Sequence, residues 1–165
     1  MISFGNEREN INSAPFLIKA VEKQENSITF IVSFARKGEK KAGTDDESIP
    51  LLNEILADSA PLYPDANSTY EITFEDYILY MTRNESYTSW DRYEIRHGRY
   101  FILFERSRLL ERLPEFVECG LIQAAGANTY KHYGIYCQNH IVDIITAHVP
   151  VIQWLSRGVT GEEHR

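Results

Sequence analysis

The sequence predicts an α+β domain built mainly from antiparallel β-hairpins, with six to seven strands and two or three short helices packed on the sheet. Apolar and polar side chains alternate in several short runs, most clearly at Ile28, Phe30, Val32 and Phe34. That period of two is typical of a strand with one apolar face. The runs also lack the regular strand–helix alternation of parallel α/β folds, which favours the α+β class.

Strand patterns recur along most of the chain. They cover residues 16–21, 28–34, 70–75, 77–82, 92–96, 99–105, 131–138 and 141–146. The run at 77–82 either follows a bend at 75–76 as a strand or forms a short helix. His97-Gly98 and Asn139-His140 predict two hairpin turns, because Gly and Asn tolerate the positive φ that tight turns require.

Helix signals are fewer than strand signals. Ser48 is placed to cap a helix over 48–57, and Ser107 to cap one over 107–120, where Pro114 predicts a kink or a split and Gly120 a C-terminal cap. Residues 151–155 fit a short helix or a terminal strand. The polar or turn-rich segments predict loops at 37–48, 60–67, 83–91 and 121–129.

With 165 residues, the chain fits one domain, 1–165, with loosely ordered ends at 1–14 and 158–165. The N-terminus lacks the pattern of a secretory signal and the longest apolar runs are far shorter than a membrane span. We therefore expect a soluble, cytoplasmic protein without membrane contact. Two cysteines, Cys119 and Cys137, are too few for a disulfide framework and lack zinc-site spacing, so they are expected to be small packed thiols.

The net charge is −7, which argues against a nucleic-acid partner. The charge is unevenly distributed. Residues 42–82 contain no Lys or Arg and nine carboxylates, namely Asp45, Asp46, Glu47, Glu54, Asp58, Asp65, Glu71, Glu75 and Asp76. Seven arginines follow between Arg83 and Arg112. A negative surface of this kind would attract a basic partner.

The histidines do not predict a metal site. His132, His140 and His148 recur every eight residues, which matches no metal-binding motif. If Gln138 pairs with Ile141 across the hairpin, His132 shares a face with Tyr136 and Asp143, whereas His148 points to the other face. His97 and His164 are expected to be solvated.

Asp143 interrupts the apolar run Ile141-Val142-Asp143-Ile144-Ile145. A buried carboxylate needs a partner, and such groups gather at functional sites. His132, Tyr136 and Asp143 are therefore candidate pocket residues. The structural alternative is a hydrogen bond that Asp143 accepts from Tyr136 or from a nearby arginine, or an edge position facing water.

Other catalytic signatures are missing. Glu71 and Glu75 would lie about 13 Å apart along a strand, which is farther than paired carboxylates act in glycoside hydrolysis and fits a solvated face. There is no nucleophile elbow and no phosphate-binding glycine loop. No cofactor and no metal are expected, and catalytic residues are not identified.

A polar and aromatic cluster lies in the connection at 83–91. It contains Glu85, Tyr87, Trp90 and Asp91, and Tyr, Trp and Arg dominate binding hot spots. The alternative is that Tyr87 and Trp90 anchor the loop by packing into the core.

Two functions remain open. The first is a protein-interaction module that presents an acidic surface to a basic partner through Glu85, Tyr87, Trp90, Asp91, Asp45, Asp46 and Glu47; bacterial immunity proteins and antitoxins resemble the chain in charge only. The second is a small-ligand-binding protein or enzyme, with a pocket between sheet and helices that uses Asp143, His132, Tyr136, Glu85 and the hairpin from Arg92 to Arg106. The sequence indicates no oligomeric state.

Overall fold

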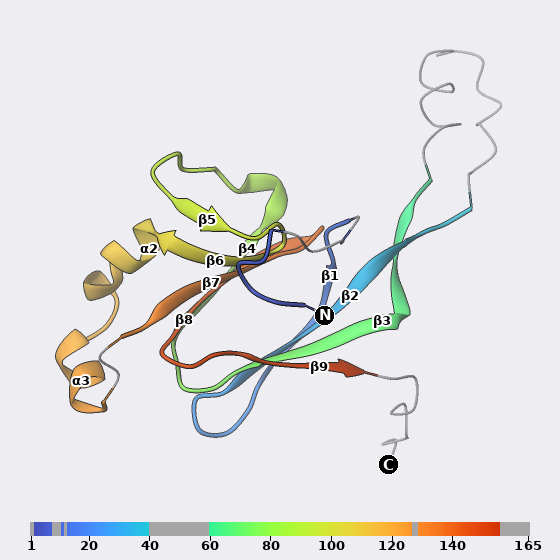
Figure 1. The fold of residues 1–165 in the computed structure, drawn as a ribbon. Coiled ribbons are helices and arrows are strands. Elements are labelled where there is room, and N and C mark those ends of the chain that lie inside the picture. Colours follow the sequence, from blue (N-terminus) through green and yellow to red (C-terminus); the bar gives the residue numbers. More distant parts are fainter. Residues whose placement is uncertain (1, 8–10, 12, 40–59, 127–128, 156–165) are drawn as a thin grey trace.

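A computed structural model describes residues 2–7, 11, 13–39, 60–126 and 129–155. The described chain is mostly antiparallel β, with nine strands in two sheets and few, short helices (Figure 1). The expected count of six to seven strands is therefore too low for this fold. The predicted helix at 48–57 lies outside the described residues.

Sheet A has four strands in the order β1-β2-β3-β9. Their bounds are β1 (Phe16–Glu22), β2 (Ile28–Lys37), β3 (Leu62–Phe74) and β9 (Val151–Leu155). The segment 60–67, expected to be a loop, forms the first part of β3 instead, where residues 62–64 pair with residues 35–37 of β2. Of the two structures that fit 151–155, the strand is the one that forms.

Sheet B has five strands in the order β4-β8-β7-β6-β5. Their bounds are β4 (Tyr77–Asn84), β5 (Ile95–His97), β6 (Phe101–Arg106), β7 (Lys131–Tyr136) and β8 (His140–Thr146). Gly98, in the turn between β5 and β6, has φ +94°, and a Cβ there would lie 2.3 Å from the Phe101 carbonyl oxygen. The turn therefore requires glycine at this position, as the sequence predicted, but it covers residues 98–100 rather than His97-Gly98, because His97 is the last residue of β5.

The chain passes between the two sheets at Glu75-Asp76 and again at 147–150. Asp76 adopts φ +45°, and Tyr77 then starts β4 as a strand rather than a helix. The Thr146 hydroxyl donates to the Glu75 carbonyl over 2.9 Å, which ties the end of β8 to this bend. The strand predictions on either side of the bend thus belong to different sheets.

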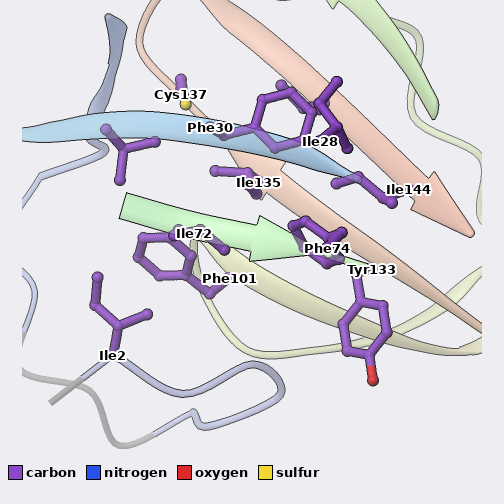
Figure 2. Packing of buried hydrophobic residues seen from close by; sticks show 12 residues of the cluster. Ile2, Ile28, Phe30, Ile72, Phe74, Phe101, Tyr133, Ile135, Cys137 and Ile144 are labelled. Atoms are coloured by element: carbon purple, nitrogen blue, oxygen red, sulfur yellow. The ribbon is translucent and has the colours of Figure 1, made fainter. Parts of the chain in front are cut away.

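The core fills the space between the sheets, and Figure 2 shows it from close by. Phe74 from β3 lies at its centre and makes ring contacts with Phe30 of β2, with Tyr133 of β7 and with Phe4. The fully buried apolar residues include Ile28, Phe30, Val32, Ile72, Phe74, Phe101, Ile135, Val142 and Ile144. Because they alternate along their strands, the period-two pattern of the sequence places them all between the sheets.

An N-terminal segment completes this core. Ile2 is buried, and Phe4 contacts the rings of Phe74, Phe101 and Tyr133 edge-on. The Gly5 N–H donates to the Phe101 carbonyl over 2.9 Å. These residues fall within 1–14, the stretch for which the sequence suggested loose order.

His97 of β5 links this N-terminal segment to sheet B. Its Nε2 lies 2.7 Å from Glu105 Oε2 and its Nδ1 lies 3.6 Å from Glu7 Oε1. The hydrogen bond with Glu105 is the main cause that raises the His97 pKa above its ordinary value of 6.5, and Glu7 adds to it. The protonated ring therefore holds Glu7 and Glu105 together.

We expect the His97 ring to titrate above pH 6.5 in an NMR titration. Because the His97 pKa is raised in the folded state, His97 adds to the free energy of unfolding. This contribution is fully present below the pKa of the unfolded chain and is lost as the pH rises through the pKa of the folded state. Glu105→Gln should lower the midpoint more than Glu7→Gln does. A midpoint at or below 6.5 in the unsubstituted chain would contradict this assignment.

Short helices lie along the chain between β6 and β7 (Figure 1). They are α2 (Arg108–Glu111), the 3₁₀ turn η2 (Leu113–Glu115) and α3 (Cys119–Ala124). The predicted cap is confirmed, since Ser107 Oγ accepts from the Leu110 N–H. The predicted split at Pro114 is confirmed as well, but Gly120 lies inside α3 rather than capping a helix, because the chain restarts helical structure at Cys119. No helix in the described part has the length and apolarity that crossing a membrane requires.

Candidate functional site

The outer face of sheet B carries a buried chain of polar side chains. Asp143 Oδ2 accepts from Arg83 Nε at 3.0 Å and from Nη2 at 2.7 Å, and Asp143 Oδ1 lies 3.0 Å from His132 Nε2. The His132 Nδ1 lies 2.7 Å from Ser107 Oγ. These hydrogen bonds link β4, β8, β7 and the start of α2. We call the four residues Ser107, His132, Asp143 and Arg83 the Ser107–Arg83 network.

Three of the four side chains of the network are buried away from solvent. Ser107, His132 and Asp143 are each about 2% exposed or less, whereas the Arg83 side chain is 35% exposed. Phe104 stacks flat on the His132 ring, with centroids 3.7 Å apart. Only the arginine end therefore reaches solvent.

The strand register explains how these residues meet. The sequence predicted Gln138 opposite Ile141 and Tyr136 opposite Asp143; the structure pairs Tyr136 with Ile141 and Gly134 with Asp143 instead. The shift of two residues keeps His132, Tyr136 and Asp143 on one face, as expected. It also brings His132 next to Asp143, which the predicted register did not.

Gly134 leaves the room that this arrangement needs. A Cβ at position 134 would lie 3.0 Å from the Tyr136 ring, 3.2 Å from Ile102 Cβ and 3.3 Å from the Phe104 ring. These distances are shorter than ordinary van der Waals contacts, so a side chain at position 134 would displace its neighbours. The absence of a side chain between His132 and Tyr136 thus lets Phe104 lie against the imidazole.

One placement of hydrogens gives each side chain of the network a partner. With a proton on Nε2, His132 donates to Asp143, and its Nδ1 accepts from the Ser107 hydroxyl. Ser107 Oγ still accepts from the Leu110 N–H at 3.2 Å. Every polar group in the interior of the network then has a partner, as buried polar groups require.

Serine, histidine and aspartate are also the residues of a hydrolase triad, in which a nucleophilic serine must reach a substrate carbonyl. Ser107 is 2% exposed, and its hydroxyl contacts His132 and the Leu110 N–H at the start of α2. The network links α2 and β4 to the sheet through these buried hydrogen bonds.

A partly exposed pair of aromatic rings, tilted against each other, lies beside the network. The Trp90 ring lies 5.3 Å from the ring of Tyr136, and the Arg96 guanidinium lies over Trp90 at 5.1 Å. Burial raises the pKa of the Tyr136 hydroxyl, and a hydrogen bond with Arg96 opposes that shift. Trp90 remains 53% exposed, so it is held in place without being buried in the core.

Asp91 adds fixed charge next to these rings. Its carboxylate accepts from the Tyr93 N–H at 2.8 Å and from Arg108 Nε at 3.0 Å. The Tyr93 bond first, and Arg108 second, hold the pKa of Asp91 below its ordinary value. Trp90, Asp91, Arg96 and Tyr136 together are called the Trp90 surface below.

The other residues predicted to contact a partner are described only in part. Glu85 and Tyr87 form the 3₁₀ turn η1 (Glu85–Tyr87), directly after β4, and Tyr87 is 87% exposed. Tyr87 therefore does not anchor the loop in the core. Asp45, Asp46 and Glu47 lie outside the described residues.

The acidic stretch is described only in part. Four of its nine carboxylates are described, and two of these have a basic side chain nearby: Glu71 pairs with Lys23 Nζ at 2.8 Å, and His148 Nε2 lies 3.4 Å from Asp76 Oδ2. Neither pair involves an arginine from the cluster at 83–112.

Within the described ranges, no group of three or more His, Cys, Asp and Glu side chains is arranged to hold a metal ion. His132 and His148 lie apart, as expected, with His148 beside Asp76. Cys137 is buried in the core, where desolvation raises its pKa to about 12, and Cys119 is half-buried in α3. Both are free thiols.

A pocket of about 660 Å³ lies away from the network. Its walls come from α3, the bend between β3 and β4, and the connection between β8 and β9, and they include Ile78, Leu121, Asp76, Glu118 and His148. None of His132, Tyr136, Asp143 or Glu85 lines this pocket. Of the predicted pocket residues, His132 and Asp143 belong to the Ser107–Arg83 network, Tyr136 belongs to the Trp90 surface and Glu85 lies in η1.

The sequence reasoning missed the two ends of the network. Ser107 was assigned only as a helix cap, and Arg83 only as one member of the arginine cluster. The sequence does contain a signal for Arg83, because an arginine is among the partners expected for Asp143.

The chain matches no family model, no curated protein sequence and no solved structure.

Proposed function

We propose that this chain is a protein-interaction module whose contact is centred on the Trp90 surface and whose partner is basic. The observation that carries the proposal is an exposed tryptophan that is held between Tyr136 and Arg96. Tryptophan and arginine are the residues most enriched at binding hot spots. A side chain that is already fixed loses little conformational entropy when a partner covers it.

The Ser107–Arg83 network supports this role by making the platform rigid. Asp143 and His132 join neighbouring strands beneath Tyr136, and Arg83 joins β4, whose end leads into Tyr87 and Trp90. Exposed residues on a rigid sheet are a common form of binding site. The network thus has a function in positioning without a catalytic step.

The expected basic character of the partner comes from the charge distribution. The chain carries −7 overall, and residues 42–82 carry nine carboxylates and no basic residue. Such a field speeds the approach of a basic protein more than it strengthens the final complex. The small-ligand alternative has less support, because the described pocket contains none of the residues assigned to it.

The test begins with a photo-crosslinking amino acid at Tyr87, which captures the partner in cells, followed by binding measurements with the purified partner. Trp90→Ala should then weaken binding by about 30-fold or more, the loss expected for a hot-spot side chain. Tyr63→Ala, which removes another exposed aromatic residue from β3, is the matched control and should leave the affinity unchanged. Equal affinity of the Trp90→Ala and unsubstituted chains would reject the proposed surface.

Charge is tested by the association rate. The triple variant Asp45→Asn, Asp46→Asn, Glu47→Gln should slow association and reduce its dependence on salt, with little change in dissociation. A control variant neutralises Glu25, Glu115 and Glu118 by substitution with Gln. If the association rate of the unsubstituted chain does not change with ionic strength, a basic partner attracted by charge is excluded.

A further inference from the structure

The two sheets have four edge strands, and they differ in how their free backbone groups are protected. Sheet A ends in β1 and β9, and sheet B ends in β4 and β5. Edge strands present unpaired N–H and C=O groups, and proteins protect them with bulges, charges, short length or coverage. Comparing the four edges shows which of them is open to another strand.

Three of the edges carry such protection. β1 is interrupted by a register shift between Leu17 and Lys19, where the lysine adds charge. β4 has a register shift between Tyr77 and Leu79 and carries Arg83. β5 has only three residues, with a register shift directly after Ile95.

Among the residues that the structure describes, β9 has none of these features. Its pairing with β3 runs without a shift from Val151 to Leu155, and its sequence, Val-Ile-Gln-Trp-Leu, contains no charge, glycine or proline. Val151 is 45% and Trp154 is 60% exposed. Among the described residues, β9 makes no backbone hydrogen bond outside its ladder with β3.

We propose that β9 is the interface at which two copies of this chain pair, antiparallel, about a two-fold axis through Gln153. The occupant of a bare strand edge is another strand, because only an extended backbone matches its alternating donors and acceptors. Sheet A then continues across the axis as one eight-stranded sheet. This interface is separate from the Trp90 surface on sheet B.

The side chains of β9 complement one another in this register. With Gln153 opposite Gln153 of the second copy, Trp154 faces Ile152 and Val151 faces Leu155, each twice. Trp154 and Ile152 lie on one face of the sheet, opposite Tyr70 and Ile72 of β3. Aromatic–aliphatic cross-strand pairs of this kind stabilise a sheet by about 0.2–1 kcal/mol each.

The charge of the chain makes β9 a more favourable contact between two copies than the charged parts of the surface. The chain carries −7, so two copies repel each other through their charged surfaces, whereas β9 brings no charge to the axis. Its neighbour Glu71, opposite Gln153 on β3, is already paired with Lys23. A five-residue edge buries less than the roughly 1,200 Å² of a standard interface, so we expect a weak, concentration-dependent dimer.

Sedimentation velocity over a wide concentration range tests this dimer. The unsubstituted chain should move from monomer to dimer as its concentration rises. Gln153→Lys places two positive charges opposite each other at the axis and should raise the dissociation constant at least about tenfold. Gln153→Thr, which is neutral and favours strands, should keep the dimer, and so should Ile18→Lys on the opposite edge of sheet A.

A second measurement tests the register itself. Gln153→Cys should form a disulfide-linked dimer under mild oxidation, because the axis brings the two residues face to face, whereas Ile18→Cys should not. Trp90→Ala should leave sedimentation unchanged, which separates this interface from the proposed binding surface. A chain that stays monomeric at every concentration, or a dimer that Gln153→Lys leaves intact, would overturn the proposal.

Discussion

Replacing Asp143 with alanine is expected to lower the free energy of unfolding by about 1–3 kcal/mol, because it leaves a buried hydrogen-bond donor without its acceptor. The loss leaves His132 Nε2 without its acceptor in a site that is almost fully buried. Arg83 also loses both hydrogen bonds that hold its guanidinium. Urea denaturation, followed by circular dichroism, measures the change.

Two further variants show that the effect comes from the network. Asp143→Asn keeps an acceptor for His132 but loses the charge that binds Arg83, so its cost should fall between that of alanine and zero. Glu115→Ala removes an exposed carboxylate that pairs with Arg112 and should change the stability by less than about 0.5 kcal/mol. A cost for Asp143→Ala as small as that for Glu115→Ala would mean that the network contributes little.

Phe74→Ala is expected to cost about 3–5 kcal/mol, the range found when a large aromatic side chain is removed from a core. Phe74 is fully buried and contacts the rings of Phe4, Phe30 and Tyr133, so no single neighbour can fill the cavity. The matched control is Phe116→Ala, since Phe116 is 59% exposed. That variant should lose less than about 0.5 kcal/mol in the same denaturation experiment.

The pattern of side chains along each strand predicted which residues form the core. Phe30, Val32 and Phe74 lie between the sheets because a strand turns alternate side chains to the same face. Such a pattern does not name the partner of a strand. It therefore could not divide the strands between two sheets, although a bend at 75–76 between the runs 70–75 and 77–82 was one of its two alternatives and is the one that forms.

The register of the last hairpin shows why the site was only partly predicted. Local preference predicts a short turn at Asn139-His140, whereas the turn that forms is centred on Gln138 and Asn139, since the Cys137 N–H donates to the His140 carbonyl over 2.8 Å and β8 begins at His140. The Asn139 side chain accepts from the Leu17 N–H at 3.0 Å and donates to the Leu17 carbonyl at 3.1 Å, and the Gln138 N–H donates to the Pro15 carbonyl. These contacts join residues more than 120 positions apart, so no local pattern could give them.

The same limit applies to the Ser107–Arg83 network. A carboxylate in an apolar strand predicted that Asp143 has a partner, and an arginine was one of the candidates considered. Which arginine it is depends on β4 lying beside β8, a pairing of segments about sixty residues apart. The exposed Trp90 likewise depends on Tyr136 and Arg96, which reach it only through the fold.

The two thiols give the molecule an internal reporter of its own opening. Cys137 is 2% exposed and its pKa is raised to about 12, so alkylating reagents meet almost no thiolate while the sheets are closed. Cys119, half-buried in α3, is accessible without such opening. Modification of Cys137, counted by mass spectrometry against that of Cys119, therefore records how often the two sheets separate under native conditions.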